Sequence, residues 1–264
     1  MDASLDRGDG VSIAWQSRGD GTPPILLLPT WSISPARVWK HHGHYLAHHH
    51  RVIAFDGRGA GASSRPTCAA DYADAEFVAD AVAVLDAAGV SAALVVGLSA
   101  GGRWAIELAA RHPDRVLGLV LLGPAVRLGG GVDFDADPEA DEGWARYSRH
   151  SWRRDYRGFL DFFFAEMFPE PHSTRQIEDA VAWGLDIGEP TLELTVDAPS
   201  FTGVDSAAAC RALRCPVLVL HGGDDRIVPH RVGAEIAELT GGALVTVPGA
   251  GHGLHARYPA FVAG

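Results

Sequence analysis

Short runs of aliphatic residues recur along this chain, and each run gives way to glycine-rich or helix-forming sequence. Runs that are apolar at every position are typical of strands buried on both faces of a parallel sheet. Residues 77–88 instead place apolar side chains three to four positions apart, which predicts a helix. Together the two patterns predict an α/β fold, with a mostly parallel central sheet and helices on both faces. The strands are expected at residues 11–16, 25–28, 52–55, 93–97, 116–122, 216–220 and 243–247.

The strand pattern is interrupted between residues 125 and 205. This segment starts with glycines and acidic residues, and it continues as helix-forming sequence that is rich in aromatic residues. We therefore expect a core of residues 1–124 and 206–264 and a helical insertion at residues 125–205. A chain of 264 residues that is 47% hydrophobic is long enough for one large core.

The sharpest local signal is a Gly-x-Ser-x-Gly motif that directly follows the run at residues 93–97. A serine on such a strand-to-helix turn has its hydroxyl lifted clear of the sheet, so Ser99 is a candidate nucleophile. Gly97 and Gly101 are expected because a Cβ at either position would collide with neighbouring backbone. The Ala100 amide, at a helix N-terminus, is placed to bind a developing oxyanion. The alternative is a glycine-rich turn that only lets a helix pack closely on a strand.

The loops that leave the last two expected strands carry an acid and a base. Asp224 and Asp225 follow residues 216–220, and His252 lies between glycines after residues 243–247. A histidine in such a loop is expected to be mobile and solvent-accessible, which suits proton transfer with a serine. The acid would orient the imidazole and stabilise its charged form.

Four motifs in this order resemble those of single-domain α/β-hydrolases, over about residues 10 to 259. The resemblance implies the α/β-hydrolase fold, and it implies a catalytic triad of Ser99, Asp225 and His252. The family pattern selects Asp225 over Asp224, because Ile-Val-Pro starts two residues after it. The family also commonly inserts a lid over the catalytic cleft, which would be residues 125–205. The matching segments are the serine motif, residues 56–63 (Asp-x-Arg-Gly-x-Gly-x-Ser), residues 222–229 and residues 249–252.

Other histidines compete for the role of base or suggest a metal site. His221 closes a strand and His255 lies one turn beyond the expected loop, so each matches the family pattern less well than His252. A further cluster precedes the strand at residues 52–55, but it has no carboxylate or cysteine beside it, and we expect no functional metal. Its members are His41, His42, His44, His48, His49 and His50.

One segment departs from the family pattern. The loop after the expected strand at residues 25–28 usually carries His-Gly, and this chain has Pro29-Thr30 there, followed by Trp31. The resemblance implies that the main-chain amides of Trp31 and Ala100 form the oxyanion hole, because main-chain donors survive most side-chain changes. The Trp31 indole would either wall the pocket or pack in the core.

The aromatic residues of the insertion suggest the nature of the substrate. Trp152, Tyr156 and Phe163 fall on one face of a predicted helix. Such a stripe suits packing of a lid against the core, but a thin lid also turns some rings towards the cleft. We therefore expect these three side chains in a substrate pocket that takes an apolar or aromatic group.

Composition limits the partners. A net charge of −11 disfavours nucleic acid and anionic membranes, so we expect a small-molecule substrate and neither of these partners. Residues 1–7 lack an apolar signal segment, and three cysteines without paired spacing suit a reducing compartment. These features predict a cytoplasmic protein. The oligomeric state is not specified by the sequence.

The expected reaction is hydrolysis of a carboxylic ester, lactone or thioester through an acyl-enzyme, without a cofactor. Hydrolytic carbon–carbon cleavage of a diketone-type substrate uses the same triad in similar folds and is an alternative. A ligand-binding receptor with slow turnover is a second alternative. Epoxide and haloalkane hydrolysis in this fold normally need aspartate at the elbow, where this chain has Ser99.

Overall fold

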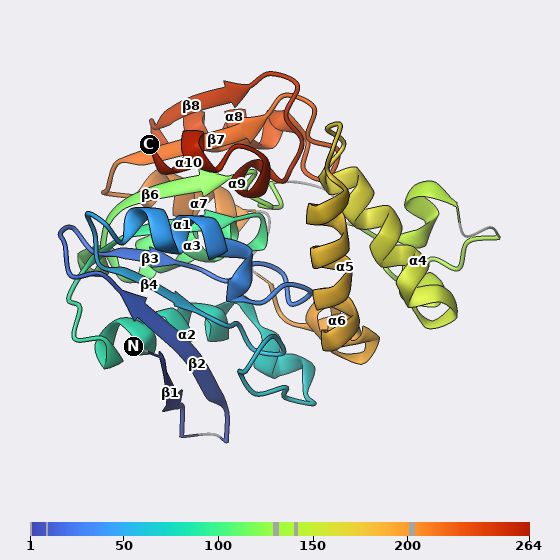
Figure 1. The fold of residues 1–264 in the computed structure, drawn as a ribbon, viewed down its shortest axis with the longest axis horizontal. Coiled ribbons are helices and arrows are strands. Elements are labelled where there is room, and N and C mark those ends of the chain that lie inside the picture. Colours follow the sequence, from blue (N-terminus) through green and yellow to red (C-terminus); the bar gives the residue numbers. More distant parts are fainter. Residues whose placement is uncertain (1, 9, 129–131, 140–141, 201–203) are drawn as a thin grey trace.

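The computed structural model describes residues 2–8, 10–128, 132–139, 142–200 and 204–264. At its centre is an eight-stranded sheet in the order β1-β2-β4-β3-β5-β6-β7-β8 (Figure 1). The pairs β1–β2 and β2–β4 are antiparallel, and the other neighbours are parallel. The fold class expected from the sequence is therefore confirmed. The strands are β1 (Asp2–Asp6), β2 (Ser12–Arg18), β3 (Ile25–Leu27), β4 (Val52–Phe55), β5 (Ala93–Leu98), β6 (Val116–Leu122), β7 (Val217–Gly222) and β8 (Ala243–Val247).

The seven expected strands are present, and β4, β6 and β8 have the expected bounds. Strand β1 was not expected, because Asp2–Asp6 contains no apolar run. It lies at the edge of the sheet and pairs with β2, and its residues are alternately exposed and half-buried. An edge strand in an antiparallel pair keeps one face in water, so it does not need the continuous apolar sequence of a central strand.

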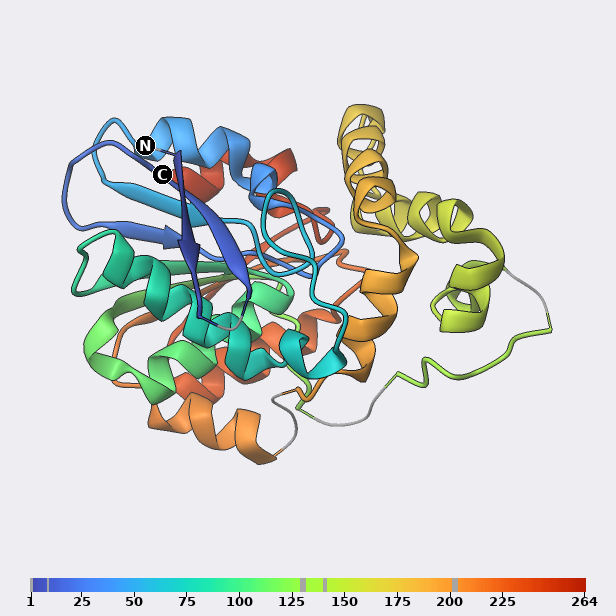
Figure 2. The ribbon, with the colours of Figure 1, turned by 90° about the horizontal axis from the view of Figure 1, so that it is seen from below.

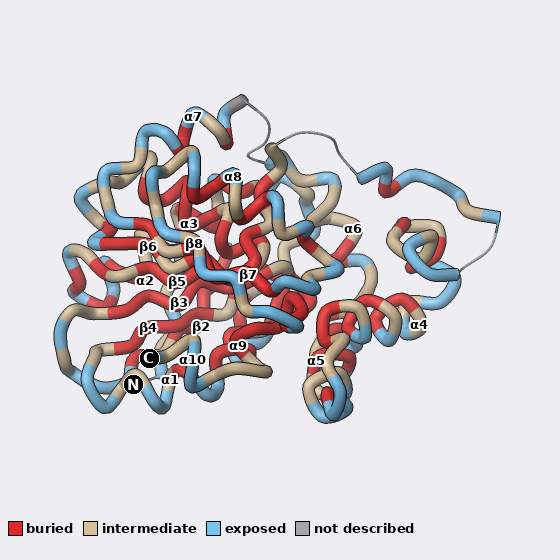
Figure 3. Tube along the Cα trace, turned by 90° about the horizontal axis from the view of Figure 1, so that it is seen from above, coloured by how far each residue is buried: buried red, intermediate tan, exposed pale blue. Residues whose placement is uncertain are grey.

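Helices cover both faces of the sheet (Figure 2). Neighbouring residues of β5 face opposite layers: Val95 joins the apolar cluster with α2, α3, α7 and α8, and Val96 joins the cluster with α1 and α9. Figure 3 shows burial concentrated along the central strands. The helices of these layers are α1 (Lys40–Leu46), α2 (Asp74–Ala87), α3 (Ala100–Arg111), α7 (Val204–Ala212), α8 (His230–Thr240), α9 (Leu254–Arg257) and α10 (Pro259–Ala263).

The insertion lies beside the carboxyl ends of the parallel strands (Figure 1). Leu98 of β5 and Leu220 of β7 share one apolar cluster with Phe159 and Phe164 of the insertion. The insertion therefore packs directly on the sheet. Among the described residues, no helix combines the length and the apolar character needed to cross a bilayer. The helices of the insertion are α4 (Arg149–Met167), α5 (Thr174–Ile187) and α6 (Glu189–Asp197).

Helix α4 is interrupted at Asp155, whose φ of −150° and ψ of 75° are not helical. The Asp155 carboxylate accepts a hydrogen bond of 2.8 Å from the Gly158 amide, so it caps the second half of the helix. The rings of Trp152 and Phe159, on either side of the break, still pack with their centroids 5.2 Å apart. The expected aromatic stripe thus forms across a break and not along one continuous helix.

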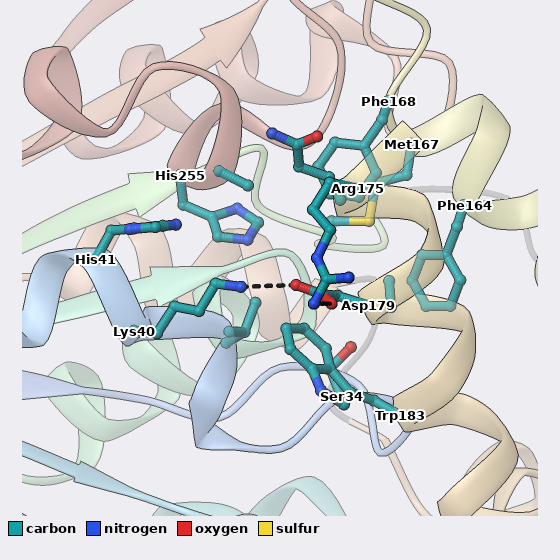
Figure 4. Close-up of a pocket in the computed structure, with 14 residues that line it drawn as sticks. Ser34, Lys40, His41, Phe164, Met167, Phe168, Arg175, Asp179, Trp183 and His255 are labelled. Carbon is teal, nitrogen blue, oxygen red and sulfur yellow. Dashed lines mark hydrogen bonds and ion pairs between the residues drawn. The ribbon is translucent and has the colours of Figure 1, made fainter. Parts of the chain in front are cut away.

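An ion pair fixes α5 to the core side of the molecule. Lys40 Nζ at the start of α1 lies 2.7 Å from Asp179 Oδ2 of α5, and Arg175 adds a second contact to Asp179 at 2.9 Å. Figure 4 shows these side chains around a small hollow of about 80 Å³, with Trp183 on one side and His255 on another. The hollow marks the seam between the insertion and helices α1 and α9.

Two buried histidines flank Trp39 next to this seam. The Trp39 indole donates a 2.7 Å hydrogen bond to Leu28 O, and its ring meets those of His42 and His255 edge-on at 5.6 Å and 5.7 Å. Both nitrogens of His42 are buried without a hydrogen-bond partner among the described residues. Burial lowers the pKa of His42 to about 4, helped by the charge of His41, and burial lowers the pKa of His255 well below its usual range.

The buried His42 predicts loss of stability in mild acid. Its pKa of about 4 in the native state lies below the value near 6.5 that imidazole has in an unfolded chain. As the pH falls from 7.5 to 4.5, the imidazole of His42 therefore takes up a proton in the unfolded state and largely not in the native state. The free energy of unfolding falls by about 2–3 kcal/mol as a result. In His42→Leu, urea unfolding at pH 7.5 and 4.5 should show a loss in the free energy of unfolding that is smaller than the wild-type loss by about this amount. His44→Leu, at an exposed position of the same helix, is the control and should behave like the wild type. Equal acid sensitivity in wild type and His42→Leu would contradict this account.

Candidate active site

The turn between β5 and α3 holds Ser99 in an unusual backbone conformation, with φ of 54° and ψ of −117°. A positive φ is rare for a residue with a side chain, so the surrounding structure must enforce it. A Cβ on Gly97 would overlap Gly101 O, and a Cβ on Gly101 would overlap Pro29 O. The expected need for glycine at both positions is therefore confirmed.

Strand β6 supports this turn from one side. The Ser99 amide donates to Leu122 O at 2.9 Å, and the Ser99 carbonyl accepts from the Ala125 amide at 2.9 Å. These two bonds place residue 123 directly beside the serine turn. Gly123 has a φ of 47°, and a Cβ there would come within 2.9 Å of His252 Nδ1 and 3.1 Å of Asp225 Oδ2. The end of β6 is thus the meeting point of the three residues that the sequence proposed as a triad.

Asp225 lies in the loop after β7, and its side chain is fully buried. Oδ1 accepts hydrogen bonds from the amides of Ile227 and Val228 at 2.9 Å and 2.8 Å, and Oδ2 accepts one from His252 Nδ1 at 2.7 Å. Burial alone would raise the pKa of this carboxyl, but the charge of His252 and the hydrogen bonds outweigh burial and hold the pKa well below its usual range. The neighbouring Asp224 is exposed, so the structure pairs His252 with Asp225.

His252 is not solvent-accessible as expected, since it is only 2% exposed. The insertion holds the loop on both sides of the histidine. The Gly251 amide donates to Glu170 Oε1 at 2.9 Å, and the Gly253 amide donates to Met167 O at 3.1 Å. A Cβ on Gly253 would overlap the Phe168 ring, so the glycine allows close packing and does not confer freedom.

The competing histidines lie elsewhere. His255 is buried between the rings of Trp39 and Phe168. His221 is fully buried at the end of β7, and its Nε2 faces Val228 O at 3.0 Å and Asp225 Oδ2 at 3.2 Å. The sequence did not indicate this second contact to the acid.

The loop after β3 lies against the start of α3, where the Pro29 carbonyl approaches Gly101. Trp31 O accepts hydrogen bonds from the amides of Ile33 and Ser34 at 2.6 Å and 3.2 Å, which form a tight turn. Within the part of the chain that the structure describes, no hydrogen bond uses the amide nitrogen of Trp31 or of Ala100. Both residues line the same cavity.

A cavity of about 630 Å³ opens above these groups and includes Ser99, Ala100 and Trp31 in its lining. The Trp31 indole donates to Thr195 Oγ1 of α6 at 2.9 Å, and its ring meets that of Phe163 at 5.7 Å. Trp31 thus packs against the insertion and also walls the cavity, so the two roles left open by the sequence coexist. The aromatic residues of the lining are Trp31, Tyr72, Phe77, Trp104, Phe134, Tyr147 and Phe163.

Of the three lid residues proposed as substrate contacts, Phe163 lines this cavity. Trp152 and Tyr156 are not part of the lining. Trp152 is 1% exposed within the aromatic cluster of the insertion, and Tyr156 donates to Gly184 O at 3.2 Å. Their positions therefore support a packing role.

The sequence missed other aromatic residues of the lining, and the reason differs between them. Phe77 and Trp104 stack at 3.8 Å across α2 and α3, and on the sequence they match ordinary core positions of two helices. Tyr147 precedes α4, where no periodic pattern marks its direction, and its ring stacks on Phe163 at 5.8 Å. Nothing in the sequence distinguishes a core helix position from one that ends at a cavity.

Among the described residues, no group of three or more histidine, cysteine, aspartate or glutamate side chains is arranged to hold a metal ion. In the histidine cluster at residues 41–50, His42 is buried against Trp39. His41 and His44 are exposed on α1.

The chain is similar to one family model and to curated proteins over most of its length. Residues 23–175 match a family model described as the alpha/beta hydrolase fold. A 2-hydroxymuconate semialdehyde hydrolase from Pseudomonas putida is 30% identical over 238 residues, which are 88% of this chain and 80% of that protein. A pimeloyl-(acyl-carrier protein) methyl ester esterase from Sodalis glossinidius is 31% identical over 252 residues, which are 94% of each chain.

Solved structures are similar over almost the whole chain. An esterase from Rhodococcus sp. ECU1013 superposes with a TM-score of 0.82 at 28% identity, over 99% of this chain and 95% of that one. A structure described as an N-acyl homoserine lactone degrading enzyme has a TM-score of 0.80 at 26% identity, over 99% of this chain and 97% of that one.

Substitution of Gly123 tests whether the meeting point at the end of β6 matters for activity. In Gly123→Ala, the new methyl group would press on both His252 Nδ1 and Asp225 Oδ2. Displacement of a reacting group by a fraction of an ångström to 1 Å costs about 100-fold in rate, so we expect kcat/KM on an ester to fall by about that factor. Gly89→Ala is the matched control, because Gly89 also has a positive φ of 66° but a Cβ there meets nothing within 4 Å. Equal activity losses in the two variants would point to backbone strain alone.

Proposed function

Because the chain belongs to the alpha/beta hydrolase fold family, we propose that it is a serine hydrolase that cleaves a carboxylic ester, lactone or thioester of a small apolar or aromatic substrate. The observation that carries this proposal is the buried hydrogen bond of 2.7 Å between His252 and Asp225 beside the Ser99 turn. This bond is the base–acid half of the arrangement that nucleophilic catalysis by serine requires.

In the proposed mechanism, Ser99 Oγ attacks the substrate carbonyl and His252 Nε2 takes the hydroxyl proton. Asp225 binds Nδ1, so it fixes the tautomer and stabilises the imidazolium. The amides of Trp31 and Ala100 would receive the negative charge on the carbonyl oxygen, each contributing about 3 kcal/mol. His252 then protonates the leaving alcohol or thiol, and a water molecule activated by the same imidazole hydrolyses the acyl-enzyme.

The cavity supports a substrate with an aromatic or other apolar group. Its volume of about 630 Å³ is within the range of pockets that enclose small organic ligands. Trp31 and Phe163 line the same cavity as Ser99, and flat rings of this kind favour an apolar or aromatic partner. Two relatives described above are named as esterases, which agrees with ester cleavage.

Carbon–carbon hydrolysis of a diketone-type substrate is a second candidate. The similarity to a 2-hydroxymuconate semialdehyde hydrolase over 80% of that protein favours it. The same serine, histidine and aspartate would serve, so the two activities differ in the bond that the substrate presents to Ser99. Product analysis with an ester and with a vinylogous diketone distinguishes them.

Burst kinetics test the acyl-enzyme. Nitrophenyl acetate, butyrate, octanoate and phenylacetate should each give a burst of about one nitrophenolate per active site if deacylation limits turnover. The aromatic lining predicts that octanoate and phenylacetate give a higher kcat/KM than acetate. In Ser99→Ala, turnover should fall by about 10³-fold or more, and the melting temperature should stay close to the wild-type value.

Ser91→Ala is the control, because Ser91 is an exposed serine at the opposite end of β5. Near-wild-type turnover in Ser99→Ala would disprove the assignment of the nucleophile. No turnover of any ester by folded wild-type protein, together with cleavage of the diketone, would establish carbon–carbon hydrolysis instead. A ligand-induced melting shift without turnover of either substrate would indicate a receptor.

A further inference from the structure

The catalytic acid contacts two histidines and not one. His221 Nε2 lies 3.2 Å from Asp225 Oδ2, the same oxygen that accepts the 2.7 Å hydrogen bond from His252. His221 and Asp225 both have fully buried side chains, so no water competes for this contact. A second imidazole on the buried acid is not needed for packing, since an apolar side chain would fill the same space.

The surroundings fix the orientation and the tautomer of His221. Its Nε2 faces Val228 O at 3.0 Å, and a carbonyl oxygen only accepts, so Nε2 carries the hydrogen. Nδ1 points at α8, where a Cβ on Gly233 would overlap it, and Nδ1 has no hydrogen-bond partner among the described residues. The Nε2–H group therefore lies between two acceptors, Val228 O and Asp225 Oδ2. This hydrogen is not available to a serine, so His221 does not compete with His252 as the base.

The donors around Asp225 match its acceptor capacity. An ionised carboxylate offers about four lone-pair positions. The amides of Ile227 and Val228 bind Oδ1, His252 Nδ1 binds Oδ2, and His221 Nε2 lies 3.2 Å from Oδ2. Because each donor stabilises the charged form, every one of them lowers the basicity of the carboxylate. His221 also connects β7 to the far end of the acid loop through Val228, so it fixes the position of the acid as well as its charge.

We propose that His221 is a positioning residue for the catalytic acid: its Nε2–H holds Asp225 Oδ2 in place and limits the strength with which the carboxylate binds the His252 imidazolium. This inference rests on the proposed function of Ser99, Asp225 and His252. A carboxylate that lost one donor would bind the imidazolium more strongly. The free enzyme would then need a higher pH to present a neutral base.

The other titratable groups near this pair are on neighbouring elements. The ring of His230, from α8, lies 5.4 Å from that of His221, and His230 Nε2 is bonded to Thr246 Oγ1 at 2.7 Å. His255, from α9, is close enough to His252 for the charge of His252 to lower the pKa of His255. Arg226 points away to Glu166, at 3.6 Å. Of these groups, His230 provides the matched control because it touches the ring of His221 from the other side.

The test is the pH dependence of kcat/KM between pH 4.5 and 9 with nitrophenyl butyrate. Leucine in His221→Leu has no donor. In this variant kcat/KM at pH 7 should fall by 10- to 100-fold, and the acidic limb of the plot of kcat/KM against pH should move to higher pH by about one unit. In His221→Gln, whose amide N–H has a similar reach, most of the shift of the limb should be reversed. His230→Leu should leave the limb at its wild-type position. Equal activity losses in the Leu and Gln variants with an unmoved limb would overturn the proposal, as would wild-type kinetics in His221→Leu.

A measurement on unmodified His221 covers the case in which His221→Leu does not fold. In protein labelled with ¹⁵N-histidine, the neutral His221 ring should show the tautomer with its hydrogen on Nε2. Asp225→Asn should shift the Nε2–H resonance of His221, because it replaces the charged acceptor. An unchanged resonance would overturn the proposed contact. Since this readout does not need turnover, it separates failure of the His221 proposal from failure of the hydrolase assignment, which Ser99→Ala tests.

Discussion

The strained backbone at Ser99 is the constraint on which the rest of the site depends. A positive φ at a residue with a Cβ costs about 1–2 kcal/mol, and the surrounding structure must offset this cost. The offset comes from the end of β6, whose Leu122 carbonyl and Ala125 amide bind the Ser99 backbone, and from glycines that leave room for the turn. The same segment of β6 then continues as Gly123 against His252 and Asp225. The position of the serine and the space for the acid and base are therefore set by one strand end.

Residues of the segment between β6 and β7 hold parts of the candidate site in place and do not only cover it. Their contacts reach both sides of the mechanism: Thr195 of α6 binds the Trp31 side chain, and Met167 and Glu170 bind the loop that carries His252. A movement of the insertion relative to the sheet would thus displace the loop of the candidate oxyanion hole and the base together. Because Phe163 of the same insertion walls the cavity, the contacts that recognise substrate and those that hold the base belong to one packed unit.

The sequence predicted the parts of the fold whose physical requirement is local. A central strand must be apolar on both faces, so β4, β6 and β8 were found with their bounds. A tight strand-to-helix turn must have glycine at Gly97 and Gly101, so the position of Ser99 was also readable. The edge strand β1 was missed because it pairs with β2 at the edge of the sheet and half of its surface stays in water.

The solvent accessibility expected for His252 was wrong for a different reason. Glycine allows a loop to move, but it equally allows another segment to approach closely, and only the fold decides between the two. Here Met167 and Phe168, more than eighty residues earlier in the chain, approach the backbone of Gly253. A contact of this kind depends on the path of the whole insertion, which no local pattern encodes.

The same distinction explains why the sequence indicated Asp225 as the candidate acid but did not indicate its environment. The choice of Asp225 over Asp224 follows from the local pattern of the loop, since Oδ1 binds the amides two and three residues later. The second imidazole on Oδ2 comes from the strand that precedes the loop, and His221 is brought back to the acid only because Val228 closes the loop onto Nε2. His221 before Asp225, the amides of Ile227 and Val228 after it, and His252 therefore act together on the charge and position of this carboxylate. A buried carboxylate that must stay ionised needs this many donors, because each one offsets part of the cost of removing the charge from water.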